Sequence, residues 1–383
     1  MQMTAIISEY NPFHNGHHYQ ASVARKETGA DVVVAIMSGT FMQRGEPAFL
    51  DKWSRAKAAV ASGAIDLVIE LPFYFAVQRA DRFASGGVSI AETIGAQTLS
   101  FGSESGETAA FEQAARLDVE STVRYRELIG RFLKEGKSSA KAASDAFAAC
   151  TDVLDLTTPN NTLGYYYARA AQDITMHTTK RIGSGYHDLS IGDIMSATAI
   201  RARHQQTGEL LAVPEATRQA AEIGKLSSYE RYYPVIRNLI LTAPQTRLEE
   251  INDIDSSLAP RLRHAALVSG SFEEFVSAVK TRRYTRTHIQ RALVYLMTQT
   301  TKQEIESVDF DSVDFIRPLA FNRDGRTALR SIKKRIHVMS TFTPHPWLTK
   351  ESQVTAAYAL PLASLDALQE HRQIPYFTGS DSR

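Results

Sequence analysis

Cysteine is nearly absent from this chain of 383 residues, since Cys150 is the only one. A single cysteine excludes an intramolecular disulfide and a cysteine-based metal cluster. Long apolar runs are also missing: no window of about 18 uncharged apolar residues occurs that could span a membrane. Nor do the first residues resemble a signal peptide, because Glu9, Asn11 and His14 interrupt any apolar core. We therefore expect a cytoplasmic protein without a membrane partner.

Neither sign of charge is in excess. Lys and Arg number 43 and Asp and Glu 42, so bulk charge points to no particular partner. The apolar content of 43% and the charged content of 22% are ordinary for a soluble globular protein. The length is sufficient for two domains, each with a sizeable core.

The first hundred residues alternate strand and helix patterns, which predicts an α/β fold with a parallel sheet and right-handed crossovers. Ligands of such sheets bind at the carboxyl ends of the strands. The expected strands cover residues 3–8, 31–37, 66–71 and 98–102, and residues 173–182 are expected to return to the sheet.

The remainder of the chain is predominantly helical in pattern. Residues 107–150 are rich in Ala, Lys and Glu and are expected to form two or three helices, as an insertion or a lid. Strand patterns fade after about residue 205. We therefore predict an α/β domain at 1–205, followed by a mainly α-helical domain at 206–383.

The segment His14-Asn15-Gly16-His17 lies between the first predicted strand and a predicted helix. A helix N-terminus attracts phosphate through its free amide groups, and a glycine lets phosphate approach the backbone. His14 and His17 are three residues apart, so both can face one ligand. This pattern suits displacement at the α-phosphate of a nucleoside triphosphate. A surface histidine pair or a helix cap is the alternative interpretation.

Further candidate residues follow other strands or open later helices. A loop at 38–47 and the next helix offer Ser38, Gln43, Arg44 and Lys52 for a substrate such as a small carboxylate. Nucleotide contacts are expected from Gly102, from one of Asn160 and Asn161, and from Arg181. Each of these could instead be an ordinary loop, cap or solvated residue.

A Ser-x-Thr pair, Ser196 and Thr198, opens a helix and is followed by Arg201. Two hydroxyl groups, free amides and a guanidinium can hold the β- and γ-phosphates while pyrophosphate leaves. Alone, such a motif is usually a helix cap. Together with the histidine turn, it predicts a second set of contacts to the same triphosphate.

Basic residues cluster twice in the second half. Residues 280–291 contain five basic residues and no acid, and we assign nucleic-acid contact to this run ahead of the second one at 323–335. A solvated charged face is the alternative for both. The candidate RNA contacts in the first run are Lys280, Arg282, Arg283, Tyr284, Arg286 and Arg291.

The chain resembles the bacterial tRNA(Met) cytidine acetate ligases and, more broadly, the H-x-G-H nucleotidyltransferase superfamily. The resemblance spans nearly the whole sequence in order. Its blocks are EYNPFHNGH (9–17), MSGTFMQRGEP (37–47), DKWSRA (51–56), DLVIELP (66–72), FGSE (101–104), PNNTLG (159–164), KRIGSGYHD (180–188), SATAIR (196–201) and RRYTRTHIQRAL (282–293).

This resemblance implies a Rossmann-like ATP-binding catalytic domain at 1–205 and a tRNA-binding domain at 206–383. The implied enzyme forms acetyl-adenylate from ATP and acetate, with Mg2+, and acetylates N4 of the wobble cytidine in the anticodon loop of elongator tRNA(Met). It also implies that His14 and His17 are catalytic. No protein partner is implied. The segment expected to line ATP comprises Ile7, Ser8, Glu9, Tyr10, Asn11, Pro12, Phe13, His14, Asn15, Gly16, His17, His18, Tyr19 and Gln20.

Two other functions use the same residues. A small-molecule adenylyltransferase acting on a phosphorylated metabolite would need the histidine turn and the Ser-Thr pair but not the basic second half. A non-catalytic RNA-binding protein would need the second half but not the intact pair of histidines. An exchange of labelled pyrophosphate into ATP that depends on acetate distinguishes the ligase from both.

Overall fold

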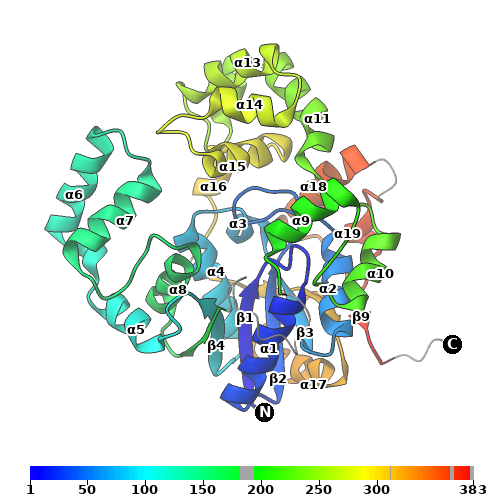
Figure 1. Cartoon of the computed structure of the whole chain (residues 1–383). Helices are drawn as coiled ribbons and strands as arrows, with labels where there is room; N and C mark the ends of the chain where they lie inside the picture. Colours follow the sequence, from blue (N-terminus) through cyan, green and yellow to red (C-terminus); the bar gives the residue numbers. More distant parts are fainter. Residues whose placement is uncertain (182–193, 311, 363–365, 380–383) are drawn as a thin grey trace.

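The computed structural model of the chain describes residues 1–181, 194–310, 312–362 and 366–379. Its centre is a seven-stranded sheet in the order β5-β4-β1-β2-β3-β7-β9 (Figure 1). The first five strands in this order are parallel, whereas β7 runs antiparallel to β3. Among the described residues no helix is long and apolar enough to cross a membrane.

The five parallel strands confirm the predicted α/β fold. They are β1 (Met3–Ser8), β2 (Val32–Ser38), β3 (Leu67–Leu71), β4 (Thr98–Ser103) and β5 (Thr175–Lys180). The order 3-2-1-4-5 is that of a doubly wound sheet, in which the strand order reverses between β1 and β4. Ligands of such folds bind in the crevice at the carboxyl ends of these two strands.

Helices cover both faces of the sheet because its central strands are apolar on both sides. Alternate residues of β2 belong to two different core clusters: Val34 and Ile36 to one, Val33 and Ala35 to the other. α1 (Asn15–Thr28) and α2 (Lys52–Ala61) pack on the second face. α4 (Ala80–Thr93), α8 (Pro159–Ala170) and α17 (Arg323–Ile332) pack on the first.

The predicted helical insertion between β4 and β5 is confirmed. It contains α5 (Thr108–Arg116), α6 (Val123–Lys134) and α7 (Ser139–Cys150), and then α8. α6 and α7 extend away from the sheet (Figure 1). At the turn between them, Gly136 comes close to Arg282 of the second half: an added Cβ would lie 4.0 Å from Cδ of that arginine.

The second half begins with helices and then returns to the sheet. Its elements up to residue 306 are α9 (Ala197–Thr207), α10 (Glu215–Ile223), α11 (Tyr229–Thr242), α12 (Gln245–Glu250), α13 (Leu258–Val268), α14 (Phe272–Val279), α15 (Arg286–Met297) and α16 (Lys302–Glu306). α18 (Pro346–Ala359) and α19 (Gln369–Arg372) follow later. The helices α11 and α13–α16 form the upper part of Figure 1.

Four short strands from this half were not predicted: β6 (Phe315–Ile316) and β8 (His337–Val338) form a separate pair, and two others join the main sheet. β7 (Pro318–Phe321) pairs with β3, and β9 (Tyr376–Phe377) pairs with β7. With four and two residues, they are too short for an alternating pattern to reveal them. The part beyond residue 205 is therefore mainly helical but also completes the sheet of the first part. The domain division at residue 205 stays a prediction.

Candidate functional site

The histidine turn forms the start of α1, directly after β1. His14 is the N-cap residue, and its Nδ1 accepts a hydrogen bond of 3.0 Å from the amide of Gly16. Nδ1 of His17 accepts from the amide of His14 at 3.4 Å. The two rings are stacked, with their centroids 3.7 Å apart. Because both Nδ1 atoms are acceptors, each neutral ring carries its proton on Nε2.

Both imidazoles are held in the neutral form. Burial, with a smaller contribution from the positive charge of Arg181, lowers the pKa of His14 to about 4. Burial, the neighbouring His14 and Arg181 together place the pKa of His17 well below its usual range. At neutral pH the pair therefore provides two neutral Nε2–H donors rather than cations.

The lowered pKa of His14 predicts a dependence of stability on pH. An unfolded histidine binds its proton near 6.5, whereas folded His14 does so only near 4. The stabilisation is therefore fully present above about pH 6.5 and is lost as the pH falls towards 4, by about 1.4 kcal/mol per pH unit. Urea denaturation at pH 7, 6 and 5 measures this loss. His14→Asn should show a shallower decline, and an equal slope in both proteins would contradict the assignment.

The missing side chain of Gly16 makes room for the ring of His14. We had expected it to let phosphate approach the backbone instead. A Cβ at this position would lie 2.9 Å from Cε1 of His14, so glycine makes room for that ring. The first amides of α1 are also occupied: Asn15 donates to the carbonyl of Ala212 at 2.9 Å, and Gly16 donates to His14. The prediction of free amide groups is wrong at these two positions.

Other residues of the 7–20 segment build the turn. Tyr10 and Phe13 are buried and pack against His17, at centroid distances of 4.9 and 5.8 Å. The side chain of Asn11, also buried, accepts from the amide of Phe49 at 2.6 Å. These three side chains therefore position the turn. Their ATP contacts stay a prediction.

Glu9 links this turn to the loop after β2. Its Oε1 accepts from the amide of Gln43 at 2.7 Å, and burial raises the pKa of its carboxyl. The side-chain amide of Gln43 donates to the carbonyl of Gln78 at 2.7 Å. Ser38 is fully buried, whereas Arg44 is exposed. Of the candidate residues in this loop, only Arg44 is open to solvent.

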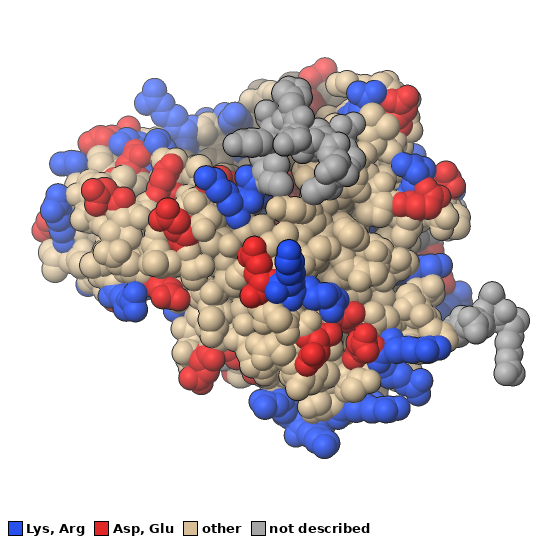
Figure 2. Space-filling model, turned by 60° about the horizontal axis from the view of Figure 1, so that its bottom comes forward, with Lys and Arg blue, Asp and Glu red and all other residues tan. Residues whose placement is uncertain are grey.

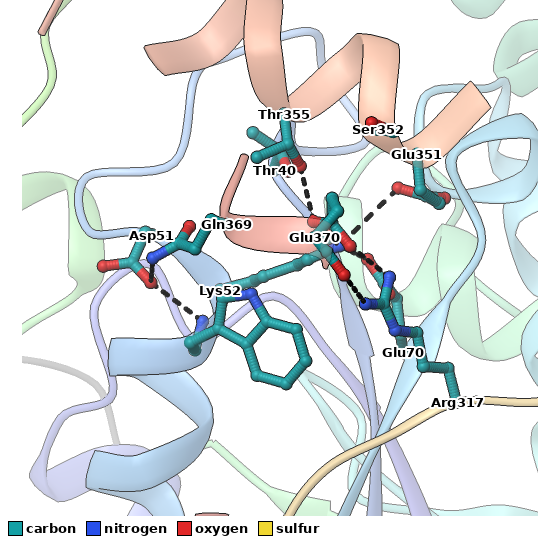
Figure 3. A network of polar contacts seen from close by, with 12 residues as sticks. Thr40, Asp51, Lys52, Glu70, Arg317, Glu351, Ser352, Thr355, Gln369 and Glu370 are labelled. Atoms are coloured by element: carbon teal, nitrogen blue, oxygen red, sulfur yellow. Dashed lines mark hydrogen bonds and ion pairs between the residues drawn. The ribbon is translucent and has the colours of Figure 1, made fainter. Parts of the chain in front are cut away.

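Lys52 lies inside the protein, not in an open substrate site (Figure 3). Its ammonium group is buried among Glu70, Glu370 and Glu351; the Nζ–Oε1 distance to Glu370 is 2.6 Å. Arg317 pairs with the same Glu70 and Glu370. The expectation that Lys52 contacts a substrate is therefore corrected: its charge is neutralised within a buried ionic cluster that joins α2, β3, α18 and α19.

Arg55, one turn further along α2, is fully buried as well. Its guanidinium donates to the backbone carbonyls of Glu9, Ser38, Gly39 and Leu50. Through these bonds it ties the end of β1 to the end of β2. Arg55 thus fixes the two loops that flank the histidine turn.

The loop after β4 is organised by Glu104 and two asparagines. Oδ1 of Asn161 accepts from the amide of Glu104 at 3.1 Å, and its side chain is buried. Asn160 is only partly buried; it donates to Oε1 of Glu104 at 2.5 Å and accepts from Arg181 at 3.5 Å. Asn160 therefore lies on the side of the loop that faces Arg181, and Asn161 holds the loop together.

Gly102 and Arg181 are neighbours at the ends of β4 and β5. A Cβ on Gly102 would lie 3.5 Å from Cγ of Arg181. Arg181 is exposed and also acts on both histidines electrostatically. The structure thus brings together His14, His17, Arg181 and Asn160. Residues 182–188 of the same motif lie outside the described residues.

A hollow of about 360 Å³ opens on the other side of this loop. Three carboxylates, those of Glu104, Glu107 and Asp155, are among its lining residues. Because acidic groups repel phosphate, we do not place a triphosphate there.

The Ser-x-Thr segment lies against the histidine turn. Cγ2 of Ile194 would be 3.4 Å from a Cβ on Gly16, and Arg201 donates to the carbonyl of Asn11 at 2.6 Å. Ser196 caps α9 by accepting from the amide of Ala199 at 3.2 Å; Ser196 and Thr198 are both exposed. Arg201 also pairs with Glu46 at 2.8 Å, so its guanidinium braces the loop and is not free for phosphate.

The basic run at 280–291 is largely neutralised. Arg283 pairs with Asp255, Arg286 with Glu273, and Arg291 with Asp253. Tyr284 is buried and donates its hydroxyl to Asp255 at 2.7 Å, so it cannot stack on a base as expected. Lys280 and Arg282 are exposed, with no ion pair to the described part of the chain.

One constellation was not found from the sequence. Ser100 on β4 contacts Nδ1 of His177 on β5 at 2.9 Å, and Nε2 of that histidine contacts Glu27 at 2.8 Å. This is the order of groups in a hydrolase triad. Ser100 is fully buried, however, so it cannot meet a substrate, and the trio is structural. Strand pairing, which sequence spacing does not reveal, brings it together.

Comparisons with known proteins agree with this geometry. The chain matches the HIGH Nucleotidyl Transferase family over residues 1–372. It is 64% identical over 383 residues to the tRNA(Met) cytidine acetate ligase of Exiguobacterium sibiricum, with 100% of both chains covered. It is 36% identical over 387 residues to the enzyme of that name from Bacillus subtilis, covering 94% of this chain and 93% of the other.

A solved structure shows the same fold. The crystal structure of Thermotoga maritima TmcAL bound with alpha-thio ATP superposes with a TM-score of 0.87 at 28% identity, covering 98% of this chain and 99% of that one. The chain therefore belongs to the HIGH nucleotidyl transferases and, among them, to the family of tRNA(Met) cytidine acetate ligases.

Proposed function

We propose that this protein activates acetate with ATP and transfers the acetyl group to N4 of the wobble cytidine of elongator tRNA(Met). The observation that carries this proposal is the 64% identity, over the full length of both chains, to a protein named tRNA(Met) cytidine acetate ligase. The geometry of the histidine turn, with Arg181 and the Ser-Thr segment beside it, fits the first half of the reaction.

In the first step an acetate oxygen attacks the α-phosphorus of ATP, and pyrophosphate leaves. The attacking carboxylate and the phosphate are both anionic, so the enzyme must align them and offset their repulsion. Neutral Nε2–H groups of His14 and His17 donate hydrogen bonds to the α-phosphate oxygens as charge builds there. Arg181 supplies the positive charge that the neutral imidazoles lack.

The nucleoside is held at the ends of β4 and β5. Of the two candidate asparagines, Asn160 is the one we assign to ATP, because its side chain is partly exposed beside Arg181. Asn161 is committed to the backbone of the loop. Gly102 lies beside Arg181 at the strand end, and we assign it to the ribose or the base.

We assign the departing pyrophosphate to Ser196 and Thr198, because the neighbouring Ile194 and Arg201 contact the histidine turn. Mg2+ belongs to the proposal as the ion that accompanies ATP. Among the described residues no group of three or more His, Cys, Asp or Glu could hold a metal ion. Mg2+ is commonly held by substrate phosphates, water and one or two carboxylates, and we propose the triphosphate as its main ligand.

In the second step the N4 amine attacks the carbonyl carbon of acetyl-adenylate. The C–N bond forms, the bond to the phosphate oxygen breaks, and AMP leaves as N4 loses a proton. A wobble base lies in a single-stranded loop, where it can be turned out and reached. In the run at 280–291 we retain Lys280 and Arg282 as RNA contacts, because their charges are not paired within the described part of the chain.

The test uses the purified chain with ATP, Mg2+, acetate and total tRNA. We expect labelled pyrophosphate to exchange into ATP only when acetate is present, and one tRNA nucleoside to gain the mass of an acetyl group. Exchange without acetate that instead responds to a phosphorylated metabolite would replace this proposal with a small-molecule adenylyltransferase.

A further inference from the structure

The second basic run of the sequence forms the outer face of α17. Gly325, Ala328, Leu329 and Ile332 of this helix are buried against the sheet. The opposite side carries basic side chains at intervals of three and four residues, which places them on one stripe. We call the exposed residues Arg323, Arg326, Arg330, Lys333 and Lys334 the α17 basic face.

The α17 basic face is not neutralised from within. None of its five cations forms an ion pair with a residue that the structure describes, and Asp324 is the single acid in the run. In the run at 280–291, by contrast, Arg283, Arg286 and Arg291 each contact a carboxylate within about 3 Å. Cations without an ion-pair partner among the described residues are therefore concentrated on α17, and not in the run at 280–291 to which the sequence assigned nucleic-acid contact.

Cationic and aromatic side chains extend this face over β9. The guanidinium of Arg326 lies 5.5 Å from the ring centre of Phe377, and the ammonium of Lys57 lies 4.9 Å from that of Tyr376. Lys57 is exposed, and Tyr376 is 37% exposed. Figure 2 turns the bottom of the Figure 1 view, where α17 lies, towards the reader. It shows Lys and Arg side chains gathered along the lower margin of the molecule.

We propose that the α17 basic face binds the phosphate backbone of a base-paired arm of the tRNA. This inference rests on the proposed function, which makes a tRNA the substrate. Unpaired, exposed cations on a rigid helix gain most from a polyanion, because each phosphate contact releases a condensed counterion. Such contacts position an RNA and do not read its sequence.

The location of α17 decides which part of the RNA it binds. The amide of Asn322, just before α17, donates to the carbonyl of Asp66, just before β3, at 2.9 Å. α17 therefore begins at the amino end of the parallel strands, whereas the histidine turn lies at their carboxyl end. A strand of six residues spans about 20 Å at roughly 3.3 Å per residue. An RNA strand covers that length with about six nucleotides at roughly 3.4 Å each. When the loop that carries the wobble cytidine lies at the histidine turn, the base-paired stem next to that loop therefore extends towards α17.

The test compares two double variants in the full-length protein. Arg326→Gln with Arg330→Gln removes two free cations, and Arg283→Gln with Arg286→Gln removes two that are paired with acids. We expect the first to bind tRNA about tenfold more weakly at moderate salt, with the slope of log affinity against log salt reduced by about two. The second should change the affinity by less than about threefold. Acetate-dependent pyrophosphate exchange should be unchanged in the first variant.

The outcomes separate this inference from the function it rests on. Weaker tRNA binding with intact exchange supports it. Normal tRNA binding by the first variant, in a preparation whose parent protein acetylates tRNA, overturns the inference and leaves the function in place. If the first variant loses binding only to vesicles of anionic phospholipid and not to tRNA, the inference is also overturned. If the parent protein neither activates acetate nor acetylates tRNA, the function and the inference fail together.

Discussion

Replacing His17 with alanine is expected to reduce acetate-dependent pyrophosphate exchange by about 100- to 1,000-fold. The variant loses one preorganised neutral donor at the position where charge develops on the α-phosphate, and the loss of one such donor in other enzymes has an effect of this size. Affinity for tRNA should stay within about twofold of the parent, because His17 belongs to neither basic run. The measurements are exchange of labelled pyrophosphate into ATP and filter binding of tRNA.

His17→Gln is the matched control. Its side-chain amide keeps an N–H donor, so it should recover part of the exchange that the alanine variant loses. Loss of tRNA binding with unimpaired exchange would contradict the role assigned to His17. An exchange rate that rises as the pH falls below 6.5 would show instead that an imidazolium is required.

Replacing Lys52 with methionine is expected to lower the free energy of unfolding by about 3–5 kcal/mol, the usual effect of removing one partner from a buried ion pair. Burial alone would raise the pKa of Glu370, but Lys52 and Arg317 lower it to about 2. Burial, with the nearby Glu70, raises the pKa of Glu351 to about 8. At neutral pH Glu370 is thus ionised between Lys52 and Arg317, and the variant removes one of the two cations that compensate its charge.

Urea denaturation at pH 7 measures this effect. Lys52→Met combined with Glu370→Gln should regain a large part of the lost stability, because the unpaired charge is removed as well. If the Lys52 variant were as stable as the parent but had a much higher KM for acetate, Lys52 would be a substrate contact after all.

The fold was largely predictable because β1 to β3 are mostly apolar and alternate with helices that have apolar stripes. Strand order in a parallel α/β sheet then follows from a small set of topological rules. β7 and β9 could not be predicted, because four and two residues carry no periodicity. β7 is placed by its pairing with β3 and β9 by its pairing with β7, which are contacts between distant parts of the sequence.

The candidate site was predictable only in part. His14, His17 and Arg181 follow strands whose carboxyl ends meet, so sequence order was enough to bring them together. The error at Lys52 arose because its carboxylate partners Glu351 and Glu370 come from far along the chain. Tyr284 was misassigned for the same reason: its partner Asp255 precedes it by two helices. A sequence shows the chemical type of a charged or aromatic residue. It does not show which other residue of the folded chain pairs with it.

The pairing of Lys52 with Glu370 has a consequence for synthesis on the ribosome. The α/β core leaves the exit tunnel first, yet the carboxylate that balances its buried ammonium is translated near the end. Until Glu370 is translated, the ammonium group of Lys52 lacks one of the carboxylates that neutralise it in the folded protein. We therefore expect the final consolidation of the core to wait for the segment that carries Glu370, and a fragment ending at residue 205 to be poorly soluble when expressed alone.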